Sequence, residues 1–171
     1  LSANTLQTNA TLIDDEMAAF FREERFLLGV RLDGPEEVHD AYRLTIGGEP
    51  THARVLRGIE ALRRQQTEFN ILTLVNGRNG CDGAAIYRYL CDAGHRYLQF
   101  IPCVEFAPDG TPAPHSVRPE QWGEFLCGVY DAWRKTDIRL VSVRLFDTLM
   151  QFLLTGQRNC CEMGSDCRQY L

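Results

Sequence analysis

Residues 26–35 of the sequence read FLLGVRLDGP, and this stretch decides the class of fold. The run before the aspartate is almost wholly apolar and has the length of a strand that is covered on both faces. Asp-Gly-Pro is a turn sequence, so we expect the strand to end there. Apolar runs of similar length recur at residues 69–75 and 97–101, followed by Asn-Gly and by Pro. The sequence therefore predicts several buried strands of one kind.

Amphipathic helices are predicted between these strands. The first begins at Asp14 or Asp15, whose carboxylate can cap it, and the next begins near Thr51. A third lies around residues 85–90. A fourth follows Pro119, where apolar residues recur at helical spacing. Strands and helices therefore alternate along the chain.

Two further strands complete the pattern, one at residues 5–12 and a short one at residues 140–143, before a last apolar helix at residues 146–154. Such alternation is typical of parallel βα units. Four or five strands are too few to close an eight-stranded barrel of about 250 residues. The predicted fold is α/β, either an arc of a (β/α) barrel or a small open sheet. Both leave strand edges unpaired, so we expect a homodimer through these edges.

The composition excludes several classes of protein. The chain has 171 residues, with 18 Lys and Arg against 23 Asp and Glu, and 44% of its residues are hydrophobic. The acidic balance argues against nonspecific binding of nucleic acid. No run approaches the ~18 apolar residues that a membrane span needs. Seven scattered cysteines and the lack of a signal-peptide pattern favour a reducing, cytoplasmic location.

Polar residues at the predicted strand ends are the first candidates for a site, because ligands of α/β proteins bind there. The candidates are Asp33, Asn76 and the segment Pro102-Cys103-Val104-Glu105, which follow three successive predicted strands. Asp33 either binds a ligand or belongs to an ordinary turn. His39, Asp40 and Arg43 either grip a carboxylate or phosphate or form a local salt bridge. The Gly-Gly-Glu-Pro string at residues 47–50 matches an S-adenosylmethionine-binding motif, but no strand precedes it, and we interpret it as a loop.

The polar tail offers the best metal candidate, the cluster Cys160, Cys161 and Cys167. Thiolates close in sequence are soft ligands that suit zinc or iron–sulfur clusters. Surface thiols or a disulfide are the alternative interpretations. For the four other cysteines we expect buried packing, which is the usual role of a dispersed free cysteine.

Several short sequence motifs, taken together, indicate a protein family more specifically than any single motif does. They are QTNATL at residues 7–12, LDGP followed by HDAYR at residues 32–43, FNIL at residues 69–72, QFIP at residues 99–102, PEQWGEFL at residues 119–126 and Cys161-x5-Cys167. In this order, they resemble blocks of the anaerobic sulfatase-maturating enzymes, which are radical S-adenosylmethionine proteins. The resemblance covers nearly the whole chain.

The resemblance implies a partial radical-SAM-type (β/α) barrel over residues 1–156 and the beginning of a SPASM-type auxiliary iron–sulfur domain over residues 157–171. It implies an oxidoreductase that converts a Cys or Ser of a sulfatase polypeptide to Cα-formylglycine, using S-adenosylmethionine and [4Fe–4S] clusters. Carried over residue by residue, Arg43 and Val104 would contact the cofactor. Cys161 and Cys167 would ligate an auxiliary cluster.

The sequence also departs from the family pattern. It contains no Cys-x3-Cys-x2-Cys triplet, and Arg31 stands where the family usually places a Ser that touches the cofactor. We therefore expect part of a longer enzyme, with no catalytic residue of its own, weak cofactor binding and no turnover alone. The alternatives are a non-catalytic regulatory or peptide-binding domain that recognises sulfatases, or a radical enzyme that modifies another peptide. Whether Cys or Ser is the target stays open.

Overall fold

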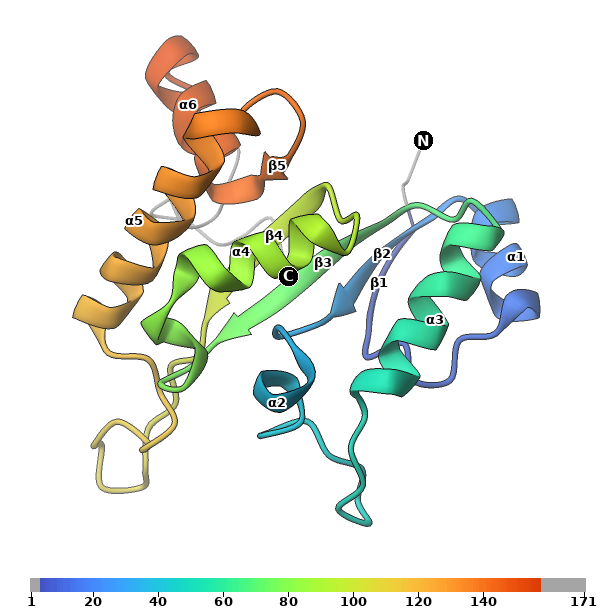
Figure 1. Cartoon of the computed structure of the whole chain (residues 1–171), viewed down its shortest axis with the longest axis horizontal. Helices are drawn as coiled ribbons and strands as arrows, with labels where there is room; N and C mark the ends of the chain where they lie inside the picture. Colours follow the sequence, from blue (N-terminus) through green and yellow to red (C-terminus); the bar gives the residue numbers. More distant parts are fainter. Residues whose placement is uncertain (1–3, 158–171) are drawn as a thin grey trace.

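A computed structural model describes residues 4–157 of the chain (Figure 1). The elements follow one another as β1 (Asn4–Thr8), α1 (Asp15–Glu23), β2 (Phe26–Arg31), α2 (Glu36–His39), α3 (His52–Arg64), β3 (Phe69–Val75), the short 3₁₀ turn η1 (Asn79–Cys81), α4 (Gly83–Asp92), β4 (Tyr97–Pro102), α5 (Pro119–Thr136), β5 (Ser142–Val143) and α6 (Arg144–Thr155). This order confirms the predicted alternation of strands and helices.

The five strands form one parallel sheet whose spatial order, β1-β2-β3-β4-β5, is also the order along the chain. Right-handed crossovers between consecutive parallel neighbours put all connecting helices on one face of the sheet. In Figure 1, α4 crosses in front of β3 and β4. A sequential order of this kind is that of a (β/α) barrel, whereas a doubly wound sheet reverses its order at a switch point.

The two faces of the sheet differ in burial. Alternate strand residues on the helix-covered face are buried and form the core with apolar residues of the helices: Leu28, Val30, Leu32, Ile71, Val75, Leu98, Phe100 and Val143. On the other face, Leu27 is 42% exposed and Tyr97 is 64% exposed. There the Arg31 guanidinium donates to Gln7 Oε1 at 3.3 Å.

The first strand is shorter than expected. We predicted residues 5–12, but β1 ends at Thr8. The side-chain oxygen of Asn9 accepts hydrogen bonds from the backbone and hydroxyl of Thr11, and Ala10 has a positive φ of 56°. This local Asx turn competes with the strand and ends it. The short strand predicted at residues 140–143 likewise contains only two strand residues, β5.

Two local expectations are confirmed, the cap of α1 and the loop at residues 47–50. Asp14 caps α1 by accepting a hydrogen bond from the backbone of Met17, and residues 47–50 form a loop. No helix among residues 4–157 is long and apolar enough to cross a membrane. Residues 158–171, which include Cys160, Cys161 and Cys167 and nearly all of the expected auxiliary domain, lie outside the described part of the chain.

Candidate functional site

The carboxyl ends of the parallel strands meet at one edge of the sheet. In Figure 1, the arrowheads of β2 and β3 point to this edge, where α2 and the loop between β4 and α5 lie. Three residues within two positions of a strand end are buried there, namely Asp33, Asn76 and Cys103. Ligands of α/β proteins bind outside this edge, so it is the candidate site.

Asp33 is a structural link rather than part of an ordinary turn. Its side chain is 4% exposed and forms an ion pair with Arg43, in which Arg43 Nε and Nη2 both donate to the carboxylate. Asp33 Oδ1 also accepts a hydrogen bond from the backbone N–H of Leu74 at 2.9 Å. Asp33 thus does more than occupy a turn, because its carboxylate joins β2 to β3 and to the segment after α2.

His39, Asp40 and Arg43 do not form one group of interacting side chains, as their sequence spacing had suggested. Asp40 does not pair with Arg43, because its Oδ1 accepts the backbone N–H groups of Thr51 and His52 at 2.8 and 2.9 Å. These are donors at the start of α3, which have no partner within the helix. Asp40 therefore stabilises the beginning of α3 through Oδ1.

His39 is fully buried behind the ion pair. Its Nδ1 accepts the backbone N–H of Asp33 at 3.2 Å, so in the neutral ring Nε2 carries the proton and donates to Thr51 Oγ1, also at 3.2 Å. The Thr51 hydroxyl donates in turn to the carbonyl of Arg43. Burial lowers the pKa of His39 to about 4, and this neutral ring ties the segment after α2 to the strand end.

Asn76 and Asn79 shape the loop after β3 and are buried. Asn79 Nδ2 donates to the carbonyls of Asp33 and Leu74, at 3.2 and 2.9 Å. Asn76 Oδ1 accepts the backbone N–H groups of Arg78 and Asn79. Both amides are thus used to fix backbone, and Asn76, which the sequence placed among the ligand-like residues, is a structural residue.

A cleft of about 920 Å³ opens beside this edge. Its lining is mainly apolar, with aromatic, proline and arginine side chains: Tyr42, Arg78, Val104, Phe106, Pro112, Pro114, Arg118 and Trp122. Among the expected cofactor contacts, Val104 lies in this lining. Arg43 is held in its ion pair near the same edge, and Arg31 lies on the open face of the sheet with Gln7.

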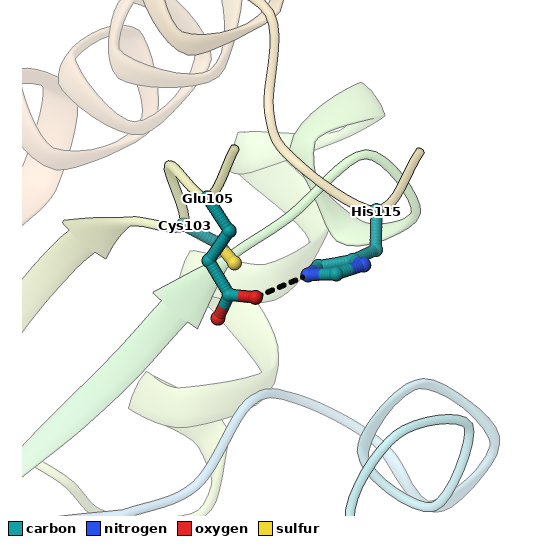
Figure 2. A group of neighbouring side chains, drawn as sticks. All are labelled: Cys103, Glu105 and His115. Atoms are coloured by element: carbon teal, nitrogen blue, oxygen red, sulfur yellow. Dashed lines mark hydrogen bonds and ion pairs between the residues drawn. The ribbon is translucent and has the colours of Figure 1, made fainter. Parts of the chain in front are cut away.

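A second group at this edge joins two candidates from the end of the fourth predicted strand, Cys103 and Glu105, to His115, which the sequence did not single out. Cys103, Glu105 and His115 place their sulfur, carboxylate and ring nitrogen atoms within 4.8 Å of one another (Figure 2). Glu105 Oε2 and His115 Nε2 are 2.9 Å apart. Burial raises the pKa of the Cys103 thiol, and the carboxylates of Glu105 and Asp33 raise it further. The loop folds back on itself to join residues that are ten apart, and no spacing rule predicts that.

The comparisons with known proteins agree on one family. The chain is 35% identical to a serine-type anaerobic sulfatase-maturating enzyme of Bacteroides thetaiotaomicron, across 96% of this chain and 43% of that protein. It is 37% identical to a cysteine-type enzyme of Clostridium novyi, across 95% and 44%. No family model matches the chain.

Solved structures give the same result. Native anSMEcpe with bound AdoMet and Cp18Cys peptide is 33% identical and superposes with a TM-score of 0.87, across 94% of this chain and 45% of that one. The five-stranded parallel sheet therefore matches part of the α/β structure of these radical S-adenosylmethionine enzymes. Within that class, the chain is homologous to the anaerobic sulfatase-maturating enzymes. It spans less than half of the length of these relatives.

Proposed function

We propose that this chain forms the cofactor-facing and substrate-facing edge of an enzyme that matures sulfatases with the help of S-adenosylmethionine. The observation that carries this proposal is the match, over 94% of the chain, to a relative whose structure contains both AdoMet and a peptide. The cleft of about 920 Å³ beside the carboxyl edge of the sheet offers the space for such ligands. In the proposed reaction, a Cys or Ser of the sulfatase is oxidised to Cα-formylglycine.

The cofactor contacts that we propose within the chain are Val104 and Arg43. Val104 is 56% exposed and lies in the cleft, so it can offer an apolar contact. The Arg43 guanidinium is oriented by its two hydrogen bonds to Asp33, with 19% of its side chain exposed. The ion pair limits what Arg43 can give to a ligand, because part of its hydrogen-bonding capacity is used within the fold. Arg31 is the weakest candidate, since its hydrogen bond to Gln7 lies on the open face of the sheet.

The residues present do not fit the radical-generating iron–sulfur cluster. That cluster needs closely spaced thiolates, and the chain has no Cys-x3-Cys-x2-Cys sequence. The described cysteines, at positions 81, 91, 103 and 127, come from four different segments. The expected burial is wrong for Cys81 and Cys127, which are exposed. We therefore derive no radical step from these residues. The proposed work of this chain is to bind and orient the substrate and the cofactor.

We propose that residues 1–156 form part of a radical-SAM-type barrel. Residues 157–171 would begin an auxiliary domain, in which Cys161 and Cys167 ligate an iron–sulfur cluster.

A cytoplasmic location is proposed from the odd number of scattered cysteines. A homodimer is proposed because the residues of the edge strand β1 are mostly exposed. Light scattering that gives a mass of 19.5 kDa at high concentration would contradict the dimer.

The test of the proposed activity is conversion of a sulfatase peptide. The complete product of the gene that encodes this chain is purified without oxygen and incubated with S-adenosylmethionine, a reductant and peptides carrying either Cys or Ser at the target position. Mass spectrometry is expected to detect formylglycine in one peptide or both. If neither peptide changes while the protein is loaded with iron and sulfide, the proposed activity is wrong.

A second function, recognition of sulfatases without catalysis, is supported by the cleft. Its aromatic and proline side chains and two arginines all come from this chain, so a peptide could bind without other parts of an enzyme. The same assay separates the two functions. Peptide binding without formylglycine would favour the recognition domain, whereas turnover would favour the enzyme.

A further inference from the structure

Three different metal-ligating groups meet on the loop between β4 and α5. Cys103 is buried directly after β4, Glu105 follows two residues later, and His115 approaches from the returning arm of the loop. Figure 2 shows the Glu105 carboxylate and the His115 ring pointing toward each other, with the Cys103 sulfur beside them. One ligand atom from each residue lies within 4.8 Å of the other two.

The backbone of the loop holds these residues together before any ligand binds. The N–H of Val117 donates to the carbonyl of Cys103 at 2.9 Å, and the N–H of Ala113 donates to the carbonyl of Glu105 at 2.8 Å. The Ser116 hydroxyl exchanges hydrogen bonds with both backbone groups of Glu105. The two arms therefore lie side by side. A preformed arrangement lowers the entropy that binding would otherwise cost.

The aromatic ring of Tyr42 packs near the His115 ring, with centroids 6.4 Å apart. This contact comes from the segment after α2 and limits the orientations of the imidazole. The Glu105 side chain is 65% exposed and the His115 side chain 38% exposed, so an ion can reach them from solvent. Cys103, by contrast, supplies a ligand from the buried end of the strand.

We propose that Cys103, Glu105 and His115 form a binding site for a divalent transition-metal ion, and that zinc is the ion the donor set suits best. A thiolate, an imidazole and a carboxylate are all zinc ligands, whereas calcium and magnesium take oxygen ligands. Three protein ligands leave a fourth tetrahedral position for water or a small ligand. This proposal does not rest on sulfatase maturation.

The ligand atoms of the three residues would have to move only slightly to bind zinc. Zinc bond lengths of about 2.0–2.3 Å at a tetrahedral centre place neighbouring ligand atoms about 3.3–3.6 Å apart. Glu105 Oε2 and His115 Nε2, now 2.9 Å apart, would separate slightly, and the sulfur lies no more than 4.8 Å from either. Because Glu105 and His115 are both partly exposed, their side chains can make this movement without repacking the core.

The site also borders the cleft. Val104 and Phe106 alternate with Cys103 and Glu105 along the same segment and line the cleft. An ion at the site would tie the returning arm of the loop, through His115, to the segment that forms this wall. Metal binding is therefore expected to stiffen one wall of the cleft.

The test uses cobalt(II) and zinc with the 171-residue chain under reducing, oxygen-free conditions. The background carries Cys160→Ser, Cys161→Ser and Cys167→Ser, because these thiols can also bind metal. We expect one cobalt ion per chain and a near-ultraviolet thiolate-to-cobalt charge-transfer band. Cys103→Ser should abolish the band. His115→Ala and Glu105→Gln should each weaken zinc binding, measured by competition with a chelator, about tenfold or more.

The matched control is Cys127→Ser, which removes an exposed thiol on α5 and should change neither the band nor the zinc affinity. A band that survives Cys103→Ser, or a zinc affinity that His115→Ala leaves unchanged, would overturn the proposal. If Cys103→Ser does not fold, the His115 variant decides alone, because its side chain is on the rim. Absence of stoichiometric binding would show that Glu105 and His115 form an ion pair only.

Discussion

The carboxylate of Asp33 and the guanidinium of Arg43 form an ion pair that closes the end of β2 against the segment after α2. The same carboxylate accepts the backbone N–H of Leu74 on β3. One buried side chain thereby fixes two strand ends and the segment that carries Tyr42 to the cleft. The geometry of the candidate site depends on this pair.

Replacing Arg43 with Ala should therefore be strongly destabilising. The substitution leaves the Asp33 carboxylate, 4% exposed, without its cationic partner. Removing one partner of a buried ion pair lowers the free energy of unfolding by about 3–5 kcal/mol. Chemical denaturation measures the loss. The matched control is Arg64→Ala, which breaks an exposed ion pair with Asp15 and should have little effect. Equal effects of the two substitutions would contradict a structural role for the buried pair.

The fold should become less stable as the pH is lowered into the mildly acid range. Burial lowers the pKa of His39 from 6.5 to about 4, and that of His95 likewise to about 4. Between these values the unfolded chain binds protons that the folded chain does not, so protonation favours unfolding. The free energy of unfolding is therefore expected to decrease as pH drops below about 6.5.

Variants assign this pH dependence to particular rings. Denaturation at several pH values should give a smaller slope for His39→Gln than for the natural chain, and a smaller slope again when His95→Gln is added. A free energy of unfolding that does not change between neutral and mildly acid pH would contradict the buried, neutral state of these rings. So would a slope that neither substitution alters.

Two glycines on neighbouring helices should respond oppositely to substitution by alanine. A Cβ atom on Gly83 of α4 would lie 2.1 Å from the backbone oxygen of Phe125 on α5, so Gly83→Ala must push the helices apart. We expect a loss of roughly 1–3 kcal/mol. A Cβ on Gly123 of α5 meets no atom within 4 Å, and Gly123→Ala should add about 1 kcal/mol through helix propensity. Thermal unfolding of both variants tests the helix contact, and similar shifts would contradict it.

The chain alone should bind S-adenosylmethionine weakly. No Cys-x3-Cys-x2-Cys sequence is present to hold the cluster that chelates this cofactor in the family, and Arg43 is already paired with Asp33. Remaining hydrogen bonds to a charged group, worth about 1.5–3 kcal/mol each, must offset a loss of translational and rotational freedom of several kcal/mol. Calorimetry is expected to show no saturable heat at micromolar concentrations. Micromolar affinity would prove this expectation wrong.

Much of the fold was predictable because its signals are local. The apolar run ending at Leu32, the cap at Asp14 and the proline at the start of α5 each act within a few residues. The misjudged end of β1 has a local cause too, since the Asn9 side chain bonds the backbone two residues away. At this position the Asx turn outweighs the strand preference of the following residues.

The site was less predictable because its contacts are long-range. The partner of Arg43 is ten residues away at Asp33 rather than beside it at Asp40. His115 reaches Glu105 only because the loop folds back on itself. No helical or strand period joins such positions, so the sequence identified the residue types at the strand ends but not their partners.

The role that we propose for the carboxyl edge of this chain is to bind the sulfatase substrate. The most direct measurement is titration of the 171-residue chain with a fluorescent peptide that spans the target Cys or Ser of a sulfatase. The variants are Val104→Asp and Phe106→Ser, two exposed residues of the cleft wall, and the control is Leu12→Ser, an exposed residue outside the cleft lining. We predict saturable binding that both cleft variants weaken at least about tenfold and the control leaves unchanged, as expected for residues at the centre of an interface. No saturable binding, or equal binding by all four proteins, would contradict the account.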